Sequence, residues 1–124
     1  MLRDPGRRWR RVSCRGSAHS AFAATALGDD VTAIVDADVA FHRALVASLD
    51  SPRLARAHEL VINEMRLCLA QVQSHHLLDA TEIRAEHESI LDAIRRGDPV
   101  DAKRAGLFHL SHAESKLLEH LARH

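Results

Sequence analysis

Four stretches of the chain carry hydrophobic residues at the three- and four-residue spacing of an amphipathic helix. The stretches cover about residues 29–49, 52–75, 80–96 and 99–124. Turn-forming residues separate them, and the connections are short. Short connections place consecutive helices side by side in opposite directions. The pattern therefore predicts an all-α fold, an antiparallel helical bundle of about four main helices.

Polar caps and prolines mark the expected helix ends. Ser51 and Asp98 suit the N-cap position, and each is followed by a proline, which suits the first helical position. Asp79 can cap the third helix, with Glu82 as its partner three residues on. Gly97 should end that helix, because glycine readily adopts the positive φ of a helix C-terminus. These boundaries rest on local chemistry alone.

The same spacing predicts which side chains face the core. The expected inward apolar positions are Val31, Ile34, Val35, Phe41, Leu45 and Leu49 in the first helix, Leu54, Ala57, Val61, Met65, Cys68, Leu69 and Val72 in the second, Ile83, Ile90, Leu91 and Ile94 in the third, and Ala105, Phe108 and Leu117 in the fourth. Asp38 and His42 fall on the first of these faces. An aspartate rarely faces a core without a partner, so this face should carry chemistry as well as packing.

Composition narrows the possibilities. The chain has 124 residues, of which 46% are hydrophobic, enough for one domain with a modest core. It contains ten histidines, an unusual number, and histidine is the commonest metal ligand. The two cysteines, Cys14 and Cys68, are far apart and read as free thiols in a reducing compartment. With no apolar run long enough to span a bilayer and no secretory signal, we expect a cytoplasmic protein without membrane contact.

Charge is distributed unevenly along the chain. The first twenty residues hold six arginines and one aspartate, whereas the remainder is net acidic. An acidic body is a poor platform for nucleic acid, because phosphate contacts need lysine and arginine. Residues 1–28 show no periodicity and contain scattered glycines, so we expect an irregular, arginine-rich arm that is disordered or partly helical. The folded domain should then span residues 29–124.

Four polar residues can meet inside such a bundle. Asp38 and His42 are four residues apart and project from one helix face. His87 and His109 flank the turn at Gly97 at nearly equal distances, about 15 and 18 Å at 1.5 Å per residue. One carboxylate and three imidazoles suit Zn, Ni, Mn or Fe(II). Spacing alone leaves the alternative open that the histidines are structural.

Enzyme signatures are absent from the sequence. It contains no H-E-x-x-H, E-x-x-H, G-x-S-x-G, P-loop or dinucleotide-binding glycine pattern. We therefore expect no catalytic residues. Two alternatives stay open: a small metal-dependent lyase or hydrolase, with Glu86 or His112 as its base, and a metal-free helical dimerisation module.

Several short motifs resemble one known family. They are Asp38-Val-Ala-Phe41-His42, Asp50-Ser51-Pro52-Arg53-Leu54, Glu86-His87 with Ile90-Leu91-Asp92-Ala93-Ile94, Gly97-Asp98 with Ala102, and His109-Leu110. In this order and spacing they are similar to the FCD domain, the effector-binding domain of FadR-type GntR transcription regulators. The resemblance covers about residues 29–124.

The resemblance implies a function and a ligand set. It implies a central divalent metal held by Asp38, His42, His87 and His109, and a small organic acid as effector. Arg66, which we expect to face inward or nearly so on the second helix, is then our candidate for pairing the effector carboxylate, because arginine binds carboxylates in a bidentate fork. Asn63 and His112 are further candidates for effector binding.

The chain also departs from the family's pattern. Such regulators carry a winged helix-turn-helix, which residues 1–28 cannot encode, and the first helices of the bundle look missing or shortened. We therefore expect a truncated form that meets DNA only through a winged-helix domain absent from this chain. The loss of early helices exposes apolar surface, which favours a homodimer.

Overall fold

The computed structural model describes residues 30–123, and the fold is given for these residues. They form four α-helices: α2 (Val31–Ala47), α3 (Pro52–Ser74), α4 (Ala80–Arg95) and α5 (Pro99–Ala122). No strand occurs within this range. The all-α prediction is confirmed, and each helix boundary within the described range lies within two residues of its expected position. The arm expected over residues 1–28 lies outside the described residues.

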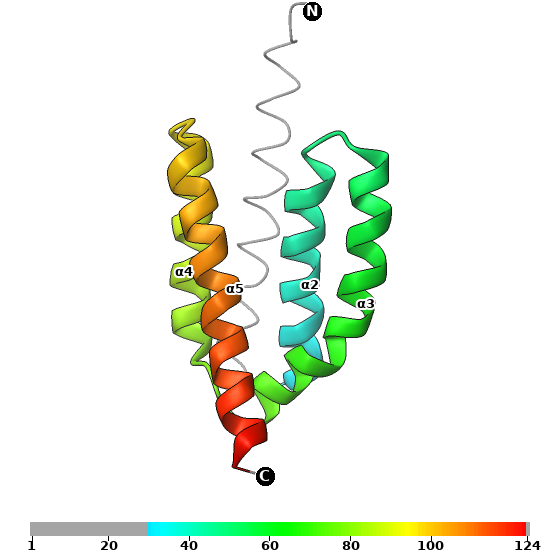
Figure 1. Cartoon of the computed structure of the whole chain (residues 1–124), viewed down its shortest axis with the longest axis vertical. Helices are drawn as coiled ribbons and strands as arrows, with labels where there is room; N and C mark the ends of the chain where they lie inside the picture. Colours follow the sequence, from blue (N-terminus) through cyan, green and yellow to red (C-terminus); the bar gives the residue numbers. More distant parts are fainter. Residues whose placement is uncertain (1–29, 124) are drawn as a thin grey trace, which may run out of the picture.

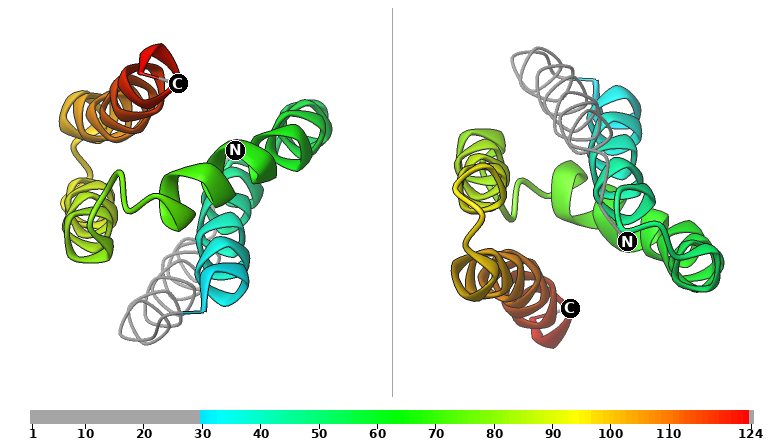
Figure 2. Two further views of the ribbon diagram at one scale, coloured as in Figure 1. Left: turned by 90° about the horizontal axis from the view of Figure 1, so that it is seen from below. Right: turned by 90° about the horizontal axis from the view of Figure 1, so that it is seen from above.

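The helices pair as two antiparallel hairpins that stand side by side (Figure 1). One hairpin is α2 with α3, and the other is α4 with α5. The last turns of α3 cross beneath α2 toward the second hairpin, as the two end views show (Figure 2). There α3 contacts α5. The fold is thus two hairpins joined at one end.

The helix ends are built as the local chemistry predicts. The side chains of Ser51, Asp79 and Asp98 each accept a hydrogen bond from a backbone N–H in the first turn of α3, α4 and α5, respectively. Gly97 has φ 70°, and its N–H donates to the carbonyl of Ile94. These bonds satisfy backbone groups that a helix end leaves without partners. The turn between α4 and α5 is thereby fixed, and with it the register of the second hairpin.

Two hydrophobic clusters hold the hairpins. Val35 and Val39 of α2 pack on Ile62 of α3 and hold the first hairpin together. The other cluster consists of Ile34 from α2, Val72 from α3, Ile83 from α4 and Leu78 from the connection between α3 and α4. Because it draws on three helices, this second cluster joins the two hairpins at the end where α2 begins.

Some expected core positions are wrong. The exposed residues among them are Leu49, Leu54, Ala57, Val61, Cys68 and Phe108. Ile62, which was not on the expected face of α3, is buried in their place, at 3% exposure. Consecutive residues of a helix differ in direction by about 100°, so the run Leu60-Val61-Ile62 offers several possible apolar faces. Packing against Val35 and Val39 selects the face that contains Ile62.

None of the four described helices combines the length and apolar character needed to cross a bilayer.

Candidate metal centre

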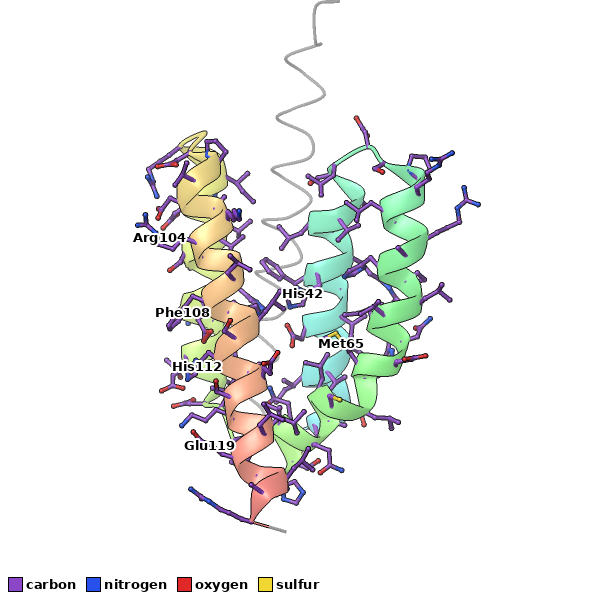
Figure 3. The ribbon with its side chains drawn as sticks, in the orientation of Figure 1. His42, Met65, Arg104, Phe108, His112 and Glu119 are labelled. Atoms are coloured by element: carbon purple, nitrogen blue, oxygen red, sulfur yellow. The ribbon has the colours of Figure 1, made fainter. Side chains whose placement is uncertain are left out.

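The polar residues singled out from the sequence meet between the two hairpins. Asp38 and His42 come from α2, His87 from α4 and His109 from α5. His42 lies on the side of α2 that faces the second hairpin (Figure 3). Asp38, His87 and His109 are buried, and the side chain of His42 is 16% exposed. The cluster therefore has one edge near solvent, at His42.

The potential ligand atoms lie close together. Asp38 Oδ1 is 3.2 Å from Nε2 of His42 and 3.1 Å from Nε2 of His87. Nε2 of His109 is 3.2 Å from Nε2 of His42. One ligand atom from each of the four residues lies within 4.8 Å of the others. Four donors of the types that bind transition metals thus converge on one point.

These separations fit a shared ion. Two atoms each about 2.1 Å from a metal are about 3.0 Å apart at a right angle and about 3.4 Å apart at the tetrahedral angle. The contacts of 3.1 and 3.2 Å fall within that interval. The widest pair needs a small contraction, since atoms on opposite sides of an ion are about 4.2 Å apart. Asp38 Oδ1 is buried, and neither of the two imidazole nitrogens beside it meets it in hydrogen-bond geometry. These four residues could therefore hold a metal ion.

The electrostatics favour the protonation states that a metal requires. Burial alone would raise the pKa of the Asp38 carboxyl, but the adjacent His42 and His87 outweigh burial and hold that pKa well below its usual range. Burial, reinforced by positive charge on His42 and His87, lowers the pKa of His109 to about 4. Near neutral pH the site therefore offers a carboxylate and at least one neutral imidazole, the forms that bind metals.

An aromatic side chain supports one of these histidines. Phe41 is fully buried and stacks on His87, with ring centroids 3.9 Å apart and an angle of 14° between the ring planes. Because Phe41 lies one position before His42 on α2, the same turn of helix supplies one ligand candidate and the ring that stacks on another. The stack restricts the plane in which His87 can present its nitrogens.

Comparison with known proteins identifies the family. The model of the FCD domain matches residues 16–112, more than half of the chain. The chain belongs to the FCD family. No curated protein and no solved structure matches it. FCD domains are effector-binding modules of GntR-family regulators, which are not enzymes, so the family implies effector-binding regulation. The match begins before residue 29, and the domain boundary expected there stays a prediction.

In this FCD domain, two of the expected effector residues lie outside the cluster. Arg66 was expected to face inward, but its Nη1 is 2.7 Å from Asp36 Oδ1 in an exposed ion pair between α3 and α2. Asn63 is exposed and accepts a hydrogen bond from Arg43 at 3.4 Å. Asp36 and Asp38 are two residues apart on a helix, so they point to nearly opposite sides of α2. The structure does not bring Arg66 or Asn63 next to the four ligand candidates, which are one aspartate and three histidines.

His112, the third expected effector residue, lies closer to the FCD domain's cluster. Its Nδ1 is 3.3 Å from Oε2 of Glu86, and the other oxygen of that carboxylate is 3.3 Å from Nδ1 of His109. Sequence reasoning considered Glu86 only as a base for an enzyme and missed this link. The available signal was a glutamate directly before His87, at a position that the helical spacing places toward α5.

Proposed function

We propose that this FCD domain binds one divalent transition metal and senses a small organic acid at that metal. Asp38, His42, His87 and His109 would hold the ion. Their convergence from three helices is the observation that carries the proposal. One carboxylate and three imidazoles favour Zn, Ni, Mn or Fe(II) over Ca or Mg. Since the four atoms fill only part of a six-coordinate shell, the ion would supply Lewis-acid positions for a carboxylate.

The placement of the ligands supports a sensing role. Asp38 and His42 belong to the first hairpin, whereas His87 and His109 belong to the second. A metal held by both would tie the hairpins together in the middle, away from the apolar cluster that joins them at one end. An effector that changes this coordination would then shift the relative placement of the hairpins, as any ligand with different affinities for two arrangements does.

The proposal extends to partners. The domain would act in the cytoplasm as the effector-binding part of a GntR-family transcription regulator. Residues 30–123 hold four helices and no winged helix-turn-helix, so contact with DNA would need such a domain. We also propose a homodimer, because large apolar side chains on α3 and α5 are exposed, among them Leu67 at 77% and Phe108 at 60%. Sedimentation equilibrium would measure this, and a monomer at all concentrations would contradict it.

Metal titration tests the centre directly. Apo-protein prepared with a chelator would be titrated with Zn²⁺, Ni²⁺ or Co²⁺ and followed by calorimetry. We expect one ion per chain, and loss of binding in His87→Ala. His76→Asn is the matched control, because it also removes a histidine but lies exposed in the turn after α3, where the backbone has φ 51° and asparagine is tolerated. Equal binding in both variants would place the metal elsewhere.

Effector binding needs a second experiment. The melting temperature would be measured with a panel of small mono-, di- and tricarboxylates, with and without the bound metal. We expect at least one acid to stabilise the metal-loaded protein and to have no effect on the His87→Ala variant. Stabilisation that is equal with and without metal would show that the acid binds away from the centre.

A further inference from the structure

The carboxylate of Glu86 links two histidines of α5. Its Oε1 is 3.3 Å from Nδ1 of His109, and its Oε2 is 3.3 Å from Nδ1 of His112. The side chain of Glu86 is 7% exposed, as is that of His109, while His112 is 26% exposed. Glu86 belongs to α4, so both contacts cross between the helices of the second hairpin.

The chemistry of these contacts determines where the protons lie. An ionised carboxylate only accepts hydrogen bonds, so each Nδ1 must donate. A neutral imidazole carries a single N–H, and therefore Nε2 of His109 presents a lone pair. That atom is the one that lies 3.2 Å from Nε2 of His42 inside the cluster. The contact with Glu86 thus turns the lone pair of His109 toward the point where the four ligand atoms converge.

Glu86 itself is not placed to be a ligand. It contacts Nδ1 of His109, and the imidazole ring stands between this nitrogen and Nε2. The carboxylate therefore lies behind the ring as seen from the cluster. With its second oxygen on His112, the carboxylate is held at both ends and cannot turn toward the cluster without breaking both contacts.

We propose that Glu86 is the positioning residue of the metal centre: it fixes the ring orientation and the Nδ1–H tautomer of His109, while His112 anchors the carboxylate from the other side. This inference rests on the proposed metal centre. Carboxylates behind metal-binding histidines raise the basicity of the ligand and fix its orientation, and their loss typically costs 10- to 100-fold in metal affinity. In this view His112 acts through Glu86 and His109 rather than directly on the metal.

The first test uses the metal-free protein. Long-range ¹⁵N–¹H correlation spectra of the imidazole rings would report the tautomer of His109 in the whole chain. We expect the Nδ1–H form in the wild type and a shift toward Nε2–H in Glu86→Ala. Glu86→Gln keeps one acceptor oxygen for two histidines, so it should fall between them. Glu88→Gln is the control, because Glu88 lies on the same helix and pairs with Arg95. An unchanged His109 tautomer in Glu86→Ala would overturn the proposal.

The second test measures Zn²⁺ affinity by competition with a chelating dye. Glu86→Ala should bind 10- to 100-fold more weakly, and Glu86→Gln should lose less. In a His109→Ala background, removal of Glu86 should have little further effect, because the role of Glu86 runs through that ring. If Glu86→Ala does not fold, the Glu86→Gln variant decides. Undiminished affinity in both variants would overturn the positioning role, whereas a wild-type chain that binds no metal but shows the expected tautomers would overturn only the proposed centre.

Discussion

Helices α2 and α4 are the shorter pair, with 17 and 16 residues, yet they bury five and six of their side chains. Helices α3 and α5 have 23 and 24 residues and bury three and one. Helices α2 and α4 therefore supply most of the core, and α3 and α5 present much of their apolar surface to solvent. Among the described residues of α5, the one buried side chain is His109. The helix that buries the fewest side chains thus buries one of the four residues that could hold a metal, His109.

The low burial of α5 raises the question of which contacts attach this helix to the rest of the fold. The partly buried Ala113 and Leu117 of α5 pack on the apolar cluster, and His109 and His112 add polar contacts with Glu86 and His42. Polar contacts contribute modestly to stability unless they are buried and fully satisfied. We therefore expect the stability of the second hairpin to depend on metal binding and protonation at the centre more strongly than that of the first.

The largest difference in stability should appear between substitutions of two phenylalanines, one on a helix that buries many side chains and one on a helix that buries few. Phe41 on α2 is fully buried, and Phe108 on α5 is 60% exposed. Phe41→Ala should lower the free energy of unfolding by about 3 to 5 kcal/mol, because it leaves a cavity against His87. In the monomer, Phe108→Ala should change it by less than about 0.5 kcal/mol. Urea unfolding of the two variants, at concentrations where the chain is monomeric, measures both, and similar losses would show that Phe108 packs against another part of the chain.

The next effect concerns the metal. An ion that binds only the folded chain should stabilise it by about 2.7 kcal/mol at a free concentration of 100 times the dissociation constant. His109→Ala should remove most of this gain, because it removes the link from α5 to the centre and leaves three ligand candidates. Denaturant midpoints with and without Zn²⁺ provide the measurement, and His76→Asn again serves as the control. An undiminished gain in His109→Ala would show that α5 takes no part in binding.

Local features of the sequence predicted much of this arrangement. The helix boundaries were predictable because Ser51, Asp79, Asp98 and Gly97 act within one turn of themselves. The pairing of His87 with His109 followed from helix geometry, since the spacing around Gly97 puts the two histidines at similar heights. Their meeting with Asp38 and His42 required in addition that the two hairpins pack against each other, which the family resemblance implied and spacing alone did not.

Which side chains of α3 are buried could not be predicted in the same way. Helix α3 has apolar residues on several faces, and only its partner decides that Ile62 is inside and Val61 outside. Arg66 was placed inward for the same reason, although Asp36 draws it to the outer side of α2. The link from Glu86 to His109 and His112 depends on the rotation of α4 about its axis, which the spacing fixes only roughly.

The third prediction concerns pH and the metal-free protein. The pKa of His109 is lowered to about 4, below its ordinary value of 6.5, first by burial and then by the charges of His42 and His87. Between these values the unfolded chain binds more protons than the folded one, so stability is full above about pH 6.5 and falls as the pH drops toward 4. The lowered pKa of Asp38 extends the loss to more acidic pH.

Urea midpoints measured in the presence of a chelator between about pH 7.5 and 5 would check this, since part of the loss falls in that range. His109→Gln should flatten the profile without removing its slope, because burial also lowers the pKa of His58. A urea midpoint that rises as the pH falls would contradict the lowered pKa values of His109 and Asp38.

The smallest effect compares two glycines in the second hairpin. Gly97 has φ 70°, so Gly97→Ala should cost about 1 kcal/mol by forcing a side chain into the left-handed region. Gly106 lies inside α5, where a Cβ would meet nothing within 4 Å among the described residues. Gly106→Ala should therefore stabilise the protein by about 0.5 to 1 kcal/mol, because glycine weakens a helix interior. Thermal unfolding measures both signs. If the stability of α5 depends on its own helix propensity and on the metal centre, Gly106→Ala should show the full stabilisation. A loss of stability would mean that the Gly106 face of α5 packs against another part of the chain or a second copy.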